Sequence, residues 1–263
     1  MKVELPTKYD IEYPEQNLKY YAAYSKPKIA GILFASCSGY CMYCGKTVRV
    51  EGDKIFHLEH SVDKKGNTHQ EMDPNGVLEH CKFNLAIACA NCNTVCKKMV
   101  DKIDLEKYSP LPHCPSKCSE MCEMYSSIRK EYMKKNAIIL QPRGIQEPIP
   151  YLISYDLLKH IYVPIVTDEQ DDVLFFIQNH IDRFELNGER FSTCIIESCS
   201  KLVLLYENGI KEFSRLVDVL NSETHLNVLE EKFIEFIQNY FSEKPVENLV
   251  DFCKLLVVLD AVP

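Results

Sequence analysis

Four cysteines are spaced in the way that zinc ligands are spaced. Cys41 and Cys44 form one C-x-x-C pair, and Cys89 and Cys92 form a second pair farther along the chain. A turn over each pair presents two sulfurs to one ion, and zinc accepts four thiolates in a tetrahedral site at about 2.3 Å. Since a catalytic zinc keeps one position open, the four cysteines predict a structural zinc site that joins the ends of the intervening segment.

A weaker group of candidate metal ligands follows the second pair. Its members are His113, Cys114, Cys118 and Cys122. The i, i+4 spacing of its three cysteines would place them on one helix face, with the fourth ligand open among His113, Cys37, Cys81 and Cys96. Cysteine on a helix face is also an ordinary small apolar residue. The sequence therefore leaves two readings, a second metal site or a packed helix face.

Acidic, imidazole and amide side chains lie between and directly after the cysteine pairs. Glu59-His60 ends the alternating run KIFHLEH, Asn84 opens the apolar run NLAIAC, and Asn93 follows the second pair. Together with the two C-x-x-C pairs, these residues resemble the HNH, or ββα-metal, nucleases over about residues 39–98. The resemblance implies a two-stranded hairpin and a helix that hold one divalent ion, usually Mg²⁺, over a scissile phosphate.

The side chains themselves fit the hydrolysis of a phosphodiester. His60 is the natural general base, because the ordinary pKa of imidazole is about 6.5. A hard ion such as Mg²⁺ or Mn²⁺ prefers oxygen ligands, and the Glu59 carboxylate and the Asn93 carbonyl supply them. We expect Asn84 to hydrogen-bond His60 and to fix the orientation and tautomer of its ring. His60 and Asn84 are thus the predicted catalytic residues, and Glu59 and Asn93 the predicted ligands of the catalytic ion.

Two features depart from the commonest HNH pattern. Aspartate is more usual before the histidine, and Glu59 is one methylene longer, which bears on how it would hold the ion. In the predicted helix, Cys96 stands before Lys97 and Lys98, so that the helical roles are open among these lysines and Asn93. Lys97 and Lys98 are candidate phosphate contacts, but a pair of lysines is also typical of a solvated helix face.

The elements expected around these residues are short strands and one helix. Strands are expected over KTVRV, over KIFHLEH and over the run that follows Asn84, and a helix over ANCNTVCKKMVDKI. Alternation along the second strand places His57 and Glu59 on one face and His60 on the other. His57 is therefore a reserve candidate for the site.

Changes in composition divide the chain into four parts. They are an N-terminal arm (1–30), the HNH core with the four-cysteine zinc site (31–107), a Cys- and Pro-rich connector (108–150) and a helical module (151–263). In the last part, apolar residues recur at helical spacing, with stops at Asn187-Gly188 and Gly209. We therefore expect an α+β fold, in which a zinc-stapled ββα-metal core precedes a mainly α-helical, partner-binding module.

A short segment of the helical module carries a narrower resemblance. Leu186-Asn187-Gly188-Glu189-Arg190 resembles the Leu-Asn-x-x-Arg helix opening of PtuB-type nucleases, the effector subunits of the Septu anti-phage system. This resemblance implies an ABC-type ATPase partner, PtuA-like, that controls the nuclease. The chain has no P-loop pattern, so the ATPase would be a separate protein.

Charge is divided unevenly along the chain. Residues 1–150 hold 21 Lys and Arg against 18 Asp and Glu, and residues 151–263 hold 9 against 20, so that +3 and −11 give the total of −8. Phosphate contacts come from local cations, so nucleic acid is expected to bind the first part. No apolar run is long enough for a membrane span, and no apolar signal segment opens the chain. We expect a cytoplasmic protein, in which 13 cysteines favour metal binding over disulfides.

Two functions remain open at this point. The first is a metal-dependent endonuclease that hydrolyses phosphodiester bonds, with DNA favoured over RNA, as the effector of an anti-phage defence system under the control of an ATPase. The second is a zinc-stapled module that binds nucleic acid or protein without catalysis. The departure at Glu59 is what keeps the second function open.

Overall fold

The computed structural model describes residues 1–6, 8–14, 21–64, 77–97, 100–108, 120–143, 151–165 and 171–261. The described chain is an α+β protein in which helices predominate and the strands form three small sheets. The predicted ligands His113, Cys114 and Cys118, the lysine Lys98 and the connector residues 109–119 and 144–150 lie outside these residues. No described helix combines the length and the apolar composition that are needed to cross a membrane.

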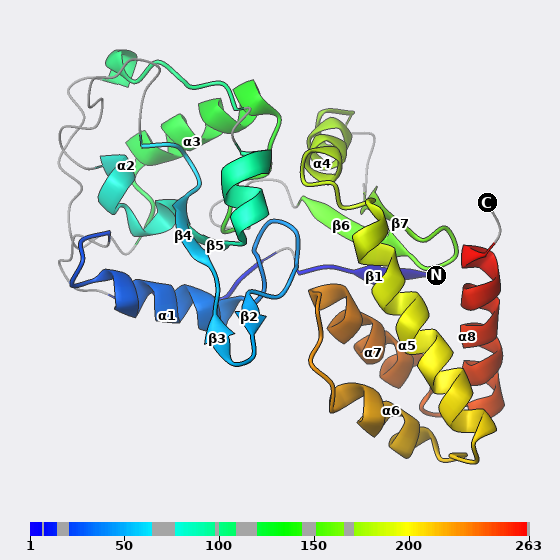
Figure 1. Cartoon of the computed structure of the whole chain (residues 1–263). Coiled ribbons are helices and arrows are strands. Elements are labelled where there is room, and N and C mark those ends of the chain that lie inside the picture. Colours follow the sequence, from blue (N-terminus) through cyan, green and yellow to red (C-terminus); the bar gives the residue numbers. More distant parts are fainter. Residues whose placement is uncertain are drawn as a thin grey trace.

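The N-terminal lobe, residues 21–143, is built around one hairpin (Figure 1). Strand β4 (His57–His60) pairs antiparallel with β5 (Leu85–Ala88), so that Glu59 lies opposite Ala86. All four residues of β5 are buried, since this uninterrupted apolar run packs against helix α1 (Lys26–Ser36). The strand that was expected over KTVRV is shorter in the structure: it consists of β2 (Arg49–Val50), which pairs with β3 (Asp53–Lys54). The lobe also contains α2 (Val77–His80), η1 (Lys82–Asn84), η2 (Cys92–Cys96), η3 (Glu106–Tyr108) and α3 (Glu123–Asn136).

The helix predicted over ANCNTVCKKMVDKI is shorter than expected. Helical backbone begins at Ala90 and ends with η2 at Cys96, while the described residues 100–105 are not helical. Asn, Cys and Thr are weak helix formers, and they make up five of the seven residues from Ala90 to Cys96, so this turn has little intrinsic tendency to extend. The chain leaves the helical turn at Lys97, whose side chain is buried.

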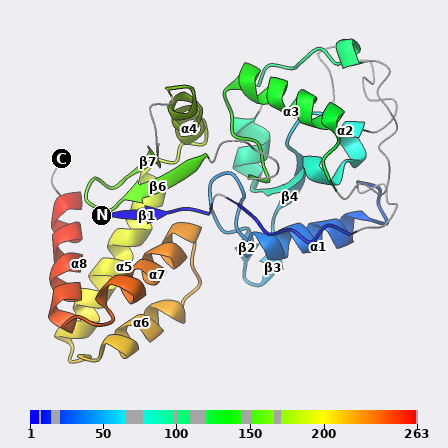
Figure 2. The ribbon, with the colours of Figure 1, turned by 180° about the vertical axis from the view of Figure 1, so that it is seen from behind.

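The C-terminal lobe combines a three-stranded sheet with five helices (Figures 1 and 2). The strands are β1 (Lys2–Glu4), β6 (Leu152–Asp156) and β7 (Ile161–Ile165), in the order β1-β6-β7. The helices are α4 (Asp171–Arg183), α5 (Glu189–Glu207), α6 (Phe213–Asn221), α7 (Val228–Phe241) and α8 (Val246–Asp260). The predicted helical spacing is confirmed: α4 buries Val173, Ile177 and Ile181, and α5 ends just before Gly209, whose φ is +100°.

The first residues of the chain pair with a strand of the C-terminal lobe. Strand β1 pairs antiparallel with β6, with Val3 opposite Tyr155. The chain then leads from this strand to α1 in the other lobe (Figure 2). A strand of three residues is too short for its alternation to be read in the sequence, so this pairing was not predicted.

The two lobes meet at the turn between Cys41 and Gly45. The Gly45 carbonyl accepts a hydrogen bond from the Val228 amide at 2.8 Å, at the start of α7. From α4, His180 donates through Nε2 to the Tyr43 carbonyl at 3.0 Å. Gly45 has a φ of +73°, and a Cβ at this position would lie 2.6 Å from Val228 Cγ1. The C-terminal lobe therefore holds the first cysteine turn from two sides.

Candidate functional site

The four predicted zinc ligands converge on one point. The Sγ atoms of Cys41, Cys44, Cys89 and Cys92 all lie within 4.8 Å of one another, and those of Cys44 and Cys89 are 3.9 Å apart. Tetrahedral zinc with bonds of about 2.3 Å requires sulfur–sulfur distances of about 3.8 Å. Three of these cysteines are buried and Cys89 is partly exposed. The cluster can thus hold a structural metal ion such as zinc.

Backbone geometry prepares the cysteines for this role. The Cys89 amide donates to Cys41 Sγ at 3.3 Å, and the Cys92 amide donates to Cys89 Sγ at 3.5 Å. Hydrogen bonds from amides favour the thiolate over the thiol, which is the form that binds metal. The Gly45 amide closes the first turn on the Cys41 carbonyl at 2.9 Å.

A buried cation accompanies the cluster. Arg143 is only 4% exposed and lines the same hollow as Cys41 and Cys44. Its Nε and Nη1 atoms make no hydrogen bond with a described residue. A buried charge without compensation is costly, and four thiolates around one Zn²⁺ leave a net charge of −2. Arg143 is thus compatible with a zinc–thiolate centre, but the same hollow also contains the carboxylates of Asp10, Glu231 and Glu235.

Three of the predicted active-site residues share one surface hollow. Glu59, His60 and Asn93 line a cavity of about 340 Å³. The other lining residues are Tyr21, Leu58, Asp63, Lys64 and Lys102. Hairpin β4–β5 and the turn that follows Cys92 carry the three predicted residues, so the cysteine cluster and the hollow share the same supporting elements.

The Glu59 carboxylate is buried and already neutralised. Lys97 Nζ lies 2.6 Å from its Oε2 atom, and the Tyr43 hydroxyl donates to Oε1. Lys97 also donates to the carbonyls of His60 at 2.7 Å and Ser61 at 3.2 Å. Burial and the neighbouring Glu59 carboxylate raise the pKa of the Tyr43 hydroxyl well above its usual value, so it stays a donor. A divalent ion at Glu59 would have to displace the Lys97 ammonium.

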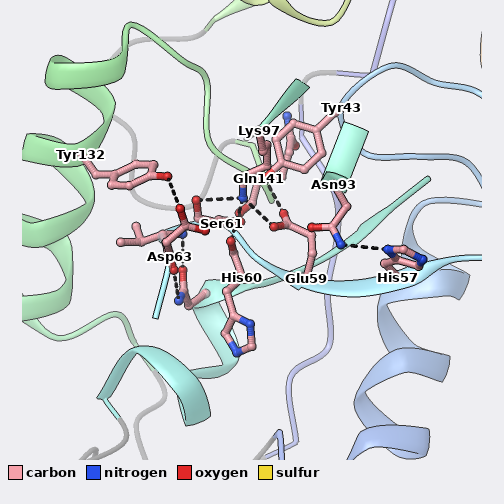
Figure 3. Close-up of polar contacts among 12 residues, drawn as sticks. Tyr43, His57, Glu59, His60, Ser61, Asp63, Asn93, Lys97, Tyr132 and Gln141 are labelled. Carbon is pink, nitrogen blue, oxygen red and sulfur yellow. Dashed lines mark hydrogen bonds and ion pairs between the residues drawn. The ribbon is translucent and has the colours of Figure 1, made fainter. Parts of the chain in front are cut away.

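The environment of Lys97 differs from the predicted one. Its side chain is directed inward, with all three ammonium hydrogens used by Glu59, His60 and Ser61 (Figure 3). The prediction of Lys97 as an exposed phosphate contact is therefore wrong. Lys97 is buried and connects the end of η2 to the end of β4. A lysine four residues after Asn93 carries no signal in the sequence for this inward direction.

Asn93 lies beside His57 on the Glu59 face of β4. Asn93 Nδ2 donates to His57 Nδ1 at 2.8 Å, and its amide lies between Glu59 and His57 (Figure 3). His60 points to the other side of the strand, as the alternation predicted. The Asn93 carbonyl is directed toward the Glu59 side and is the oxygen that a metal ion could use.

His60 is neutral and oriented by the backbone. Its Nε2 donates to the Glu79 carbonyl at 3.1 Å, and its ring packs edge-on against Tyr21 with centroids 4.4 Å apart. Burial lowers the pKa of His60 to about 4, and the nearby ammonium groups of Lys64 and Lys97 act in the same direction. Because Nε2 carries the proton, the lone pair that can accept one is on Nδ1.

Asn84 does not contact the His60 ring. It is fully buried, donating to the Val62 and Leu78 carbonyls at 2.9 and 2.8 Å and accepting from the Val62 amide at 2.7 Å and the Tyr125 hydroxyl at 2.8 Å. The predicted hydrogen bond between Asn84 and His60 is therefore replaced by the bond from His60 to the Glu79 carbonyl. Asn84 holds the loop after β4 in place instead.

Two aromatic residues of the site were missed in the sequence. Tyr43 stands inside the first C-x-x-C turn, and Tyr21 stands in a segment without helical or strand periodicity, so neither residue carries a signal for this site.

Comparison with protein-family models found no match, and neither a curated protein nor a solved structure matches the chain. The function of the site is therefore argued from its own chemistry.

Proposed function

We propose that the chain is a metal-dependent endonuclease of the HNH type, acting on nucleic acid and on DNA in the first place. The observation that carries the proposal is the single hollow that Glu59, His60 and Asn93 line. A carboxylate, an amide carbonyl and a neutral imidazole are the groups that metal-assisted phosphodiester hydrolysis needs. The four-cysteine cluster supports it, because it fixes the backbone that carries Asn93.

His60 is the proposed general base. Its Nδ1 accepts a proton from water, while the water oxygen forms a bond to phosphorus and the bond to the leaving sugar oxygen breaks. The hydrogen bond from Nε2 to the Glu79 carbonyl keeps the ring in the tautomer that this step requires. The lowered pKa of His60, about 4, keeps the base unprotonated at neutral pH.

Glu59 and Asn93 are the proposed ligands of a divalent ion, Mg²⁺ or Mn²⁺. When bound, such an ion neutralises charge on the phosphoryl oxygens and on the leaving oxygen. Binding at Glu59 requires Lys97 Nζ to leave Oε2, from which it is now 2.6 Å away. Lys97 can keep its bonds to the carbonyls of His60 and Ser61 as it does so.

A role in anti-phage defence with an ATPase partner is part of the proposal. It rests on the resemblance at Leu186–Arg190 and on the acidic C-terminal part of the chain. The C-terminal lobe also exposes large apolar side chains on two packed helices, with Leu204 of α5 60% exposed and Val258 of α8 59% exposed. Exposed apolar residues are a feature of protein-binding faces.

One observation favours the second function, a binding module without catalysis. The Lys97–Glu59 ion pair is buried, with exposed side-chain fractions of 4% and 1%. Because Lys97 already compensates the charge of this buried carboxylate, Glu59 can have a purely structural role without a metal ion. If Lys97 remains in place when nucleic acid binds, the hollow has no site for the ion.

Plasmid cleavage separates the two functions. Purified protein, alone and with any protein that copurifies from its native host, is incubated with supercoiled plasmid and Mg²⁺ or Mn²⁺. We expect nicking by the wild type and by the control His225→Ala, and a loss of at least a hundredfold in His60→Ala and Asn93→Ala. Equal nicking by all four proteins would remove His60 and Asn93 from the mechanism. Absence of nicking under every condition, with binding intact, would favour the module without catalysis.

A further inference from the structure

Cations from outside the predicted motif gather on an aromatic ring beside His60. The Lys26 ammonium lies 3.7 Å from the centroid of the Tyr21 ring, and the Lys64 ammonium lies 4.5 Å from it. The same ring packs edge-on against His60, with centroids 4.4 Å apart. Tyr21, His60 and Lys64 all line the hollow of the candidate site. Two positive charges are thus held next to the proposed base by a ring that the sequence did not single out.

A second pair of cations lies on the other end of α1. The Arg49 guanidinium lies 4.9 Å from the centroid of the Phe34 ring, and the Lys54 ammonium lies 4.6 Å from it. Arg49 and Lys54 come from strands β2 and β3 and are both exposed. Eight residues separate Lys26 from Phe34 along α1, a distance of about 12 Å at 1.5 Å per residue. That length matches three to four nucleotides of a DNA strand at about 3.4 Å each.

Aromatic contacts position these cations without neutralising them. A ring attracts an ammonium or guanidinium group through its quadrupole, but it carries no negative charge to cancel the cation. Two of the four have further partners: Lys64 pairs with the Glu79 carboxylate at 2.9 Å. Arg49 donates to the Ser38 carbonyl at 3.3 Å and shares a hollow with Glu223, Glu231 and Glu235. Helix α1 has no acidic residue in its first turn, where Lys26 lies. Among the described residues no ion pair neutralises Lys26 or Lys54, so their charge remains available to a polyanion.

We propose that Lys26, Lys64, Arg49 and Lys54 form a track that binds the backbone of a nucleic acid strand and leads it to the hollow at His60. The track supplies the phosphate contacts that the buried Lys97 does not make. The choice of nucleic acid as the ligand of this track rests on the proposed nuclease function, because only a nucleic acid substrate would need to pass from the track to the hollow. The Tyr21 ring already contacts Lys26, Lys64 and His60, so its role in the track is to position cations and not to stack on a base.

Binding of labelled DNA in the absence of added Mg²⁺ tests the track. The affinity of the full chain for a fluorescently labelled DNA duplex of about 30 base pairs is measured by fluorescence anisotropy over a range of salt concentrations. In Lys26→Gln/Lys54→Gln we expect affinity to fall about tenfold or more, and the slope of log K against log salt to shrink by about two units, since each phosphate contact contributes about 0.9. The matched control Lys201→Gln/Lys254→Gln removes two lysines from the C-terminal lobe and should leave both quantities unchanged.

Tyr21 gives a second, sharper comparison. Tyr21→Phe keeps the aromatic ring and should bind DNA as the wild type does, whereas Tyr21→Leu loses the cation–ring contacts and should bind several times more weakly. Zinc content and thermal melting are recorded for each variant, so that a misfolded protein is recognised. Equal salt slopes in the wild type and the Lys26/Lys54 variant would overturn the track, as would an equal loss in the control variant or no binding by the wild type.

Failure of the track and failure of the proposed nuclease are distinguishable. If the wild type binds along the track but does not cut, the nuclease proposal fails and the track stands. If the wild type cuts DNA, and the Lys26→Gln/Lys54→Gln variant binds and cuts DNA equally well, the track proposal fails and the nuclease proposal stands.

Discussion

The Lys97 ammonium and the Glu59 carboxylate form a buried ion pair, with Nζ and Oε2 2.6 Å apart. Glu59 comes from strand β4 and Lys97 follows the helical turn after Cys92, so the pair ties the two elements of the candidate site together. The same pair occupies the carboxylate that the proposed metal ion would use. Whether the site is catalytic therefore depends on how readily Lys97 moves.

Removing the lysine alone should be strongly destabilising. Lys97→Met leaves the Glu59 carboxylate buried and uncompensated, and we expect the free energy of unfolding to fall by about 3–5 kcal/mol. Lys97→Met/Glu59→Gln should recover a large part of this loss, because no charge remains buried. Denaturant unfolding measures the stability of both variants. Lys64→Met is the control: it breaks the more exposed Lys64–Glu79 pair and should lower the free energy of unfolding by about 1 kcal/mol or less. A similar loss in Lys97→Met and Lys64→Met would contradict the buried pair.

Zinc should be bound by the four clustered cysteines. Protein purified without chelator should contain at least one zinc ion per chain, and Cys44→Ser and Cys92→Ser should lose one ion together with the cooperative melting of the N-terminal lobe. Cys37→Ser is the matched control, since Cys37 is buried nearby and its thiol donates to the Phe34 carbonyl. Metal analysis and melting curves check the result, and a wild type with clearly less than one zinc ion per chain would refute the site.

Gly45 should report the contact between the two lobes. Gly45→Ala places a side chain at a φ of +73°, with its Cβ 2.6 Å from Val228 Cγ1, and should cost at least about 2 kcal/mol. Gly52→Ala is the control, because Gly52 has a φ of +90° but no atom within 4 Å of an added Cβ. It should show the backbone strain alone. Thermal melting should also find that Gly45→Ala/Val228→Ala regains the steric part of the loss; equal losses for the two glycines would argue against the contact.

His180 should make stability dependent on pH. Burial, helped by the nearby charges of Arg143 and Arg183, lowers the pKa of His180 to about 3, below the unfolded value of about 6.5. The stability that the neutral ring provides is therefore complete above about pH 6.5 and is lost as the pH falls toward 3, because only the unfolded chain takes up the proton. Unfolding free energies at pH 7.5 and 5 should show the wild type losing about 2 kcal/mol more than His180→Phe. Loss of zinc in acid affects both proteins, so equal losses would exclude this contribution of His180.

Substitution of Asn84 and substitution of Asn93 should have different effects on stability. Asn84→Ala removes the two buried hydrogen bonds to the Val62 amide and carbonyl and the bonds to Leu78 and Tyr125, so it should cost about 2–3 kcal/mol. Asn93→Ala removes one exposed hydrogen bond to His57 and should change stability by about 0.5 kcal/mol or less. Both should reduce cleavage, and denaturant unfolding separates the causes. An Asn84→Ala protein of normal stability without activity would return Asn84 to a direct catalytic role.

Much of the metal centre could be predicted from the sequence by itself. Two C-x-x-C pairs are enough to identify the four cysteines, because each pair is a local turn whose geometry depends on few residues. The order of strand, strand and helical turn, and the alternation that separates His60 from Glu59, are local properties as well. The helices of the C-terminal lobe follow from apolar periodicity for the same reason.

Only the tertiary structure decided what each polar side chain contacts. Lys97 turns inward because a buried carboxylate lies within its reach, and Asn84 bonds Val62, Leu78 and Tyr125 because the loop after β4 packs over it. Strand β1 joins the C-terminal lobe through pairing with a strand about 150 residues later. Hydrogen bonds and ion pairs of this kind depend on distances between segments far apart in the chain. Spacing along the sequence gives no measure of those distances, so it identified the groups of the site but not their partners.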